Sequence, residues 1–172
     1  MIMPKNTNII STKDNVAKAN YKIIGFGNIY MGDDGVGIRV IEEIRKRNLF
    51  NDYDNVILIE GGTSGIDLIF MINDSDKVII IDAIDAGQDI GEIVRFNIND
   101  IEHYTKDNFK SFSLHDVNLL DVFNLIKKLQ LKSDITVIGV KPKVIDYGDK
   151  LSPEIEDKIN NIISLIQNEV NN

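Results

Sequence analysis

The chain contains no cysteine and no tryptophan, and only three prolines and two histidines occur among its 172 residues. Without thiols it cannot form a disulfide, a zinc-thiolate site, an iron-sulfur cluster or a cysteine nucleophile. No segment approaches the roughly 20 apolar residues that a membrane-spanning helix requires. The first twenty residues also lack the apolar core of a signal peptide, so we expect a cytoplasmic protein without a membrane partner.

Basic residues are in the minority as well. The chain has 19 Lys and Arg against 27 Asp and Glu, and its formal net charge is -8. Nucleic-acid binding draws much of its affinity from Lys and Arg, so this balance argues against a nucleic-acid partner. The length and the 43% hydrophobic content are sufficient for one compact domain that needs no disulfide or structural metal.

The chain divides into two regions of different composition. Residues 1–20 are rich in Asn, Thr, Lys and Ser without a regular apolar period, which predicts a flexible N-terminal extension. From Tyr21 onward, short β-branched runs alternate with longer helical patterns, as in proteins with a largely parallel sheet. No repeat or linker interrupts this region, so residues 21–172 are predicted to form a single α/β domain.

Five runs have the composition of strands. Four are almost continuously apolar, as expected of strands covered on both faces: residues 21–26, 56–60, 77–82 and 135–140. The fifth, 92–96, follows the third too closely for a helical crossover, which favours an antiparallel edge strand.

Three segments repeat apolar residues at helical spacing, starting near Val36, Leu119 and Ile155. Ser152 and Pro153 suit the N-cap and the first position of the last helix. The predicted fold is a three-layer α/β/α domain with a mostly parallel, roughly five-stranded twisted sheet.

Candidate chemistry lies where strands end, because loops at the carboxyl ends of parallel strands meet at one edge of the sheet. Asp34 follows the first strand, Asp82 ends the third, and His115 precedes a long helix. Carboxylate oxygen and imidazole nitrogen bind borderline metals, and three ligands leave positions open for a substrate. Ser113 and Asp116 match S-x-x-D, which would place His115 in the first helical turn, where the helix dipole keeps the ring neutral.

Each of these residues also has a structural interpretation. A strand-terminal acid such as Asp82 is usually a turn or cap residue, and Asp33 is expected to cap the first helix. A local hydrogen bond would explain His115 equally well. His103 and Asp85 are interpreted as surface or supporting residues.

Glycine-rich strings follow the first two strands. Gly25-Phe-Gly27 begins like a dinucleotide fingerprint, but Tyr30 stands where a third small residue is needed, so that signal is weak. Gly61 and Gly62 follow the second strand. Such glycines most often mark turns with positive φ or a close backbone approach, and close approach also admits an extended peptide.

The ordered set of motifs resembles the hydrogenase maturation endopeptidases, which remove a C-terminal extension from the large subunit of [NiFe] hydrogenases. The resemblance covers the chain from about residue 21 to about residue 170. It rests on the strings Gly25-Phe-Gly27-Asn28, Gly32-Asp33-Asp34-Gly35-Val36-Gly37, Gly61-Gly62-Thr63-Ser64-Gly65, Asp82-Ala-Ile-Asp85-Ala-Gly87 and Gly91-Glu92, and on His115 and residues 135–142.

The resemblance implies that Asp34, Asp82 and His115 are the metal ligands, the three residues that the sheet-edge argument selects. It also implies an endopeptidase that recognises nickel already inserted in its precursor, so the free enzyme is expected to carry no metal. The metal would polarise the scissile carbonyl or activate water, or Asp82 or Asp34 would act as the general base. These roles stay open at the level of sequence. Backbone positions at the strand ends are candidates for binding the extended C-terminal tail, namely Gly27, Asn28, Gly61, Gly62 and Thr63.

Two other functions fit parts of the pattern. A receiver-type phosphoacceptor domain would use Asp82 and Lys141, but the acid pair lies too far past the first strand and His115 has no role there. A non-catalytic relative that binds a peptide without cutting it fits all the motifs. The sequence does not fix the oligomeric state, and a monomer is the working expectation.

Overall fold

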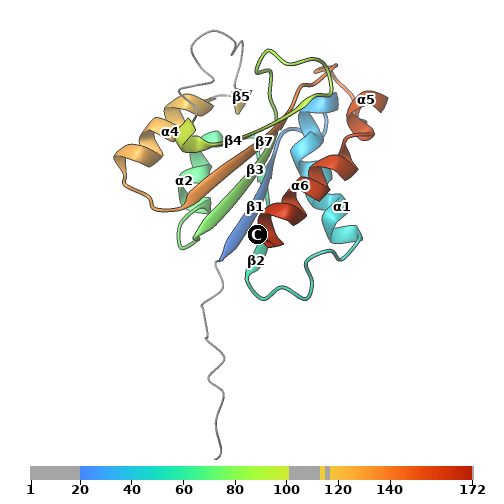
Figure 1. Cartoon of the computed structure of the whole chain (residues 1–172). Helices are drawn as coiled ribbons and strands as arrows, with labels where there is room; N and C mark the ends of the chain where they lie inside the picture. Colours follow the sequence, from blue (N-terminus) through green and yellow to red (C-terminus); the bar gives the residue numbers. More distant parts are fainter. Residues whose placement is uncertain (1–19, 101–112, 115–116, 172) are drawn as a thin grey trace, which may run out of the picture.

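The fold is seen in a computed structural model that describes residues 20–100, 113–114 and 117–171 (Figure 1). The predictions for the N-terminal extension, apart from Asn20, and for His103 and His115 lie outside the described residues. No helix in the described part of the chain combines the length and apolar character needed to cross a membrane.

Five strands form one mixed sheet in the order β2-β1-β3-β7-β4. Their bounds are β1 Tyr21–Phe26, β2 Val56–Gly62, β3 Lys77–Ala83, β4 Ile93–Asn97 and β7 Asp134–Val140. Strands β2, β1, β3 and β7 run parallel, and β4 pairs antiparallel with β7 at the edge. The predicted fold class and the predicted antiparallel edge strand are confirmed.

Helices cover both faces of this sheet, with α1 and α6 on one side and α2 and α4 on the other (Figure 1). The helices are α1 Val36–Lys46, α2 Leu68–Met71, α4 Leu119–Lys128, α5 Pro153–Glu156 and α6 Ile159–Asn171. Short 3-10 turns are η1 Gly32–Gly35, η2 Gly65–Asp67 and η3 Ile98–Asp100. A two-stranded antiparallel pair, β5 Ser113–Leu114 and β6 Val117–Asn118, precedes α4.

The sheet separates two apolar clusters. Along β3, Ile80 belongs to the cluster beneath α2 and α4, whereas Ile79 and Ile81 belong to the cluster beneath α1 and α6. Successive side chains of a strand point to opposite faces, so a strand covered on both sides needs apolar residues at every position. This requirement explains the continuous β-branched runs of the central strands.

Two helix starts differ from the predictions. The last helix is interrupted after α5, and although Ser152 occupies the N-cap beside Pro153, its side chain makes no capping hydrogen bond. Its hydroxyl donates to Asp33 instead. The helix start predicted from Ser113 is also wrong, because Ser113 pairs with Asn118 in the β5-β6 ladder and α4 begins at Leu119.

The first turn of α1 packs directly on the backbone of two strands. A Cβ on Gly37 would lie 2.3 Å from the carbonyl oxygen of Phe26 and 2.4 Å from that of Ile81. A Cβ on Gly25 would lie 2.1 Å from the carbonyl oxygen of Gly37. Backbone atoms cannot move aside as side chains do, so glycine is required here for the close approach of helix and sheet.

We therefore expect Gly37→Ala to lower the free energy of unfolding by about 2 kcal/mol, because the backbone clash outweighs the gain in helix propensity. Urea denaturation measures this loss. Gly148→Ala is the matched control, since the nearest heavy atom of the described residues would be 3.9 Å from its Cβ. An equal loss in both variants would contradict the close-approach explanation.

Candidate functional site

Asp34 is held at the end of β1 by backbone contacts. It lies in η1, is almost fully buried, and its Oδ2 accepts the backbone N–H of Asn28 at 2.8 Å. Gly27 has a φ of 132°, and a Cβ there would lie 1.9 Å from the carbonyl oxygen of Asp34. The glycine after β1 thus lets the turn close over the segment that carries the carboxylate.

Asp82 lies inside β3, opposite Gly139 of β7, and is 1% exposed. Its Oδ1 accepts the N–H of Ala83 at 2.8 Å. Because side chains alternate along a strand, Asp82 is on the same face as Ile80, toward α2 and α4. The carboxylate is therefore a buried strand residue and does not belong to the loop that follows.

The two carboxylates belong to the same end of the sheet, where the parallel strands β1 and β3 have their carboxyl ends. The 3-10 turn η1 packs against β3, and β1 and β3 are hydrogen-bonded neighbours. Within the described ranges, no group of three His, Cys, Asp or Glu is arranged to hold a metal ion. The third predicted ligand, His115, lies outside those ranges, so the complete ligand set stays a prediction.

The two glycine loops predicted to bind a peptide meet each other. The N–H of Gly27 donates to the carbonyl oxygen of Gly62 at 2.9 Å. Gly61 packs on the ring of Phe26, and no atom of the described residues lies within 4 Å of a Cβ built on Gly62. The N–H groups of Gly27 and Asn28 and the carbonyl group of Gly62 are already used inside the protein, so a peptide would have to use other backbone groups, such as those of the exposed Thr63.

Asp33 is not the helix cap that the sequence suggested. Its side chain is fully buried at 0% exposure, and the N-cap positions of η1 and α1 are Met31 and Gly35. Instead it accepts hydrogen bonds from the backbone N–H groups of Lys143, Val144 and Ser152 and from the hydroxyl of Ser152, at 2.6–2.9 Å. Asp33 thereby fixes the loop after β7 onto η1.

Lys141 lies directly after β7, and from the sequence it was named as a site residue only for the receiver-type alternative. Its Nζ lies 3.2 Å from Oδ1 of Asp85, and both side chains are about one-quarter exposed. Asp85 was interpreted as a surface or supporting residue, and this ion pair agrees with a supporting position. The rule that selected Asp82 applies equally to Lys141, because Lys141 directly follows β7.

The loop after β7 is also tied to α5. Lys143 forms an ion pair with Glu154 in the first turn of α5, and this hydrogen bond lowers the pKa of the Glu154 carboxyl. The loop thus has one buried anchor at Asp33 and one exposed ion pair at its other side.

Comparison with known proteins identifies the family of this chain. Residues 38–169 match the model of the family HycI, hydrogenase maturation protease. The hydrogenase expression/formation protein HupD of Bradyrhizobium diazoefficiens is 31% identical over 139 residues, which cover 80% of this chain and 70% of HupD. A candidate hydrogenase maturation protease of Methanocaldococcus jannaschii is 32% identical over 159 residues, covering 89% of this chain and 97% of the relative.

Solved structures support the same assignment. The [NiFe] hydrogenase maturation protease HycI from Thermococcus kodakarensis KOD1 superposes with a TM-score of 0.70 and 26% identity, covering 92% of this chain and 96% of that one. The maturating endopeptidase HybD from E. coli has a TM-score of 0.71 at 23% identity over 86% of this chain and 89% of its own, which supports the fold alone.

The fold and these matches define a protease. More narrowly, the chain belongs to the hydrogenase maturation protease family. This assignment excludes the receiver-type alternative.

Proposed function

We propose that this protease removes the C-terminal extension of a [NiFe] hydrogenase large-subunit precursor after nickel has been inserted, and that it acts in the cytoplasm as a monomer. The observation that carries the proposal is the pair of buried carboxylates, Asp34 and Asp82, at one sheet edge in a chain of this family. Buried acids are rare unless they are paired, hydrogen-bonded or bound to a metal. Oxygen ligands at such an edge suit a metal ion that arrives with a substrate.

In this proposal the nickel belongs to the precursor. Asp34 and Asp82 supply carboxylate oxygens and His115, placed by sequence, supplies an imidazole nitrogen, a combination that suits borderline divalent metals. Nickel held near the scissile bond would polarise the carbonyl group or activate a water molecule. Alternatively, Asp82 or Asp34 would act as the general base and accept the proton of the attacking water. The enzyme then needs no resident metal and no nucleophilic side chain.

The extended tail is proposed to run past the end of β2. Gly62 has a φ of 64°, no atom of the described residues lies within 4 Å of a Cβ built on it, and Thr63 is exposed. Glycine lets a peptide backbone approach closely, so main-chain hydrogen bonds can hold a tail with little dependence on its side chains.

The direct test compares a nickel-loaded precursor with the same precursor lacking nickel. We expect release of the C-terminal peptide, measured by mass spectrometry, from the loaded precursor only. Pretreating the enzyme with EDTA and removing the chelator is expected to leave the rate unchanged, because the metal comes with the substrate. Equal cleavage of both precursors would contradict nickel recognition, and binding without cleavage would identify a non-catalytic relative.

A further inference from the structure

Four apolar side chains are exposed beside the candidate site. Tyr30 is 64% exposed, Val144 45%, Ile145 54% and Tyr147 90%. We call this group the apolar rim. Single exposed apolar residues are ordinary, but two tyrosines and two β-branched residues on adjoining segments are a different case.

The rim is carried by two segments whose backbones are bonded to each other. Gly148 donates its N–H to the carbonyl oxygen of Tyr30 at 3.0 Å, and Gly32 donates to the carbonyl oxygen of Gly148 at 2.9 Å. The N–H of Asp33 donates to the carbonyl oxygen of Val144 at 3.0 Å. The buried Asp33 carboxylate adds its bonds to the same loop. These side chains therefore project from an anchored backbone.

Anchoring matters because an interface loses affinity when binding must first order a loop. At the outer end of the loop, the N–H of Tyr147 also donates to Oδ1 of Asp146 at 2.7 Å. Tyrosine gives a large contact area with few rotatable bonds and is enriched among residues that dominate binding energy. A fixed backbone that presents two tyrosines is the arrangement expected of a preformed docking surface.

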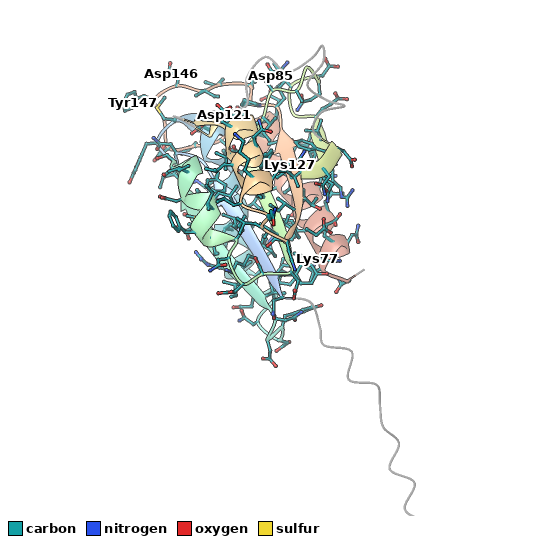
Figure 2. The ribbon with its side chains drawn as sticks, turned by 90° about the vertical axis from the view of Figure 1, so that its left-hand side faces the viewer. Lys77, Asp85, Asp121, Lys127, Asp146 and Tyr147 are labelled. Atoms are coloured by element: carbon teal, nitrogen blue, oxygen red, sulfur yellow. The ribbon has the colours of Figure 1, made fainter. Side chains whose placement is uncertain are left out.

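The rim lies at the end of the molecule that carries the candidate site. Figure 2 shows Asp146 and Tyr147 at the same end as Asp85, with Lys77 at the opposite end. The rim is also close to Asp34 along the chain. Tyr30 and Asp34 lie in one turn, and Asn28 of this turn forms hydrogen bonds with both residues. The N–H of Asn28 donates to Asp34, and its side-chain oxygen accepts the N–H of Tyr30 at 3.0 Å.

We propose that the apolar rim docks the folded body of the hydrogenase large-subunit precursor, through an apolar patch on that subunit. This inference rests on the proposed function and adds the surface by which the substrate is recognised. The tail is covalently attached to the body, so when the scissile bond reaches Asp34 and Asp82 the body must cover the surface beside them. The apolar rim is an apolar surface on the part of the protein that the body of the precursor would cover.

The test measures binding and cleavage with the nickel-loaded precursor. Variants Tyr147→Ser, Tyr30→Ser and the double variant remove the aromatic rings from exposed positions. We expect the double variant to raise both Kd and KM by about tenfold or more, with an unchanged kcat at saturating precursor and an unchanged melting temperature. Phe70→Ser is the matched control, because Phe70 is an exposed aromatic, at 77%, on α2. It is expected to leave Kd and KM unchanged.

The outcomes separate this inference from the proposed function. If the wild type cleaves the precursor and the double variant keeps the wild-type KM and Kd, docking at the rim is overturned and the proteolytic function stands. If the wild type binds without cleaving and the double variant loses binding, docking stands and proteolysis fails. If sedimentation shows a wild-type dimer that the double variant converts to a monomer, the rim is covered by a second copy of the chain and the inference is overturned.

Discussion

Asp82→Asn is expected to reduce cleavage of the nickel-loaded precursor by at least about a hundredfold while the protein stays folded. The amide is a weaker metal ligand and a far weaker base than the carboxylate, but it has nearly the same size and retains an oxygen that can accept the N–H of Ala83. Rates of tail release measured at equal enzyme concentration, with circular dichroism of each variant, test this result.

Two further variants make the test specific. His115→Ala, chosen from the sequence, is expected to cause a comparable loss. Asp121→Asn, an exposed acid in the first turn of α4, is the control and is expected to retain full activity. Unfolded Asp82→Asn protein would show that this buried carboxylate is needed for structure, and a fully active variant would remove it from the ligand set.

Asp33→Asn is expected to lower the free energy of unfolding by about 3 kcal/mol. Oδ2 of Asp33 accepts three hydrogen bonds and Oδ1 a fourth, so replacing either oxygen by an NH₂ group places donor against donor in a buried space. Chemical denaturation measures the loss, and limited proteolysis between Lys143 and Ser152 reports release of the loop.

The matched control for this variant is Asp146→Asn in the same loop. In the part of the chain that the structure describes, the exposed Asp146 side chain accepts one hydrogen bond, from the N–H of Tyr147, so its replacement is expected to change stability by about 0.5 kcal/mol or less. If Asp33→Asn is as stable as this control, Asp33 does not anchor the loop.

The strands of the sheet were largely predictable because their sequence pattern is local and repeats from strand to strand. Central strands such as β3 and β7 are buried on both faces and need an apolar residue at every position, so their sequences identify them. The antiparallel direction of β4 followed from the short connection after β3. The prediction that Asp34 and Asp82 lie at one end of the sheet rests on the geometry of parallel strands, whose carboxyl ends lie together.

The prediction that Asp33 caps the first helix failed because its contacts are distant in the sequence. Its partners lie 110 to 119 residues away in the chain, and neither helical periodicity nor capping rules detect such contacts. The same contact removes the Ser152 side chain from its expected cap. Before α4, the pairing of Ser113 with Asn118 competed with the capping pattern, because backbone groups in a ladder are not available to start a helix.

The glycine contacts beneath α1 have a consequence for engineering. The backbone of Asp34 is approached closely by Gly27, its side chain accepts the N–H of Asn28, and α1 meets β1 through Gly25 and Gly37. One isoleucine side chain belongs to this contact, since Cγ1 of Ile41 would lie 2.8 Å from a Cβ on Gly25. Redesign of the other Ile-rich positions for heat resistance can therefore proceed without shifting the acid, provided that the three glycines, Ile41 and the asparagine are kept.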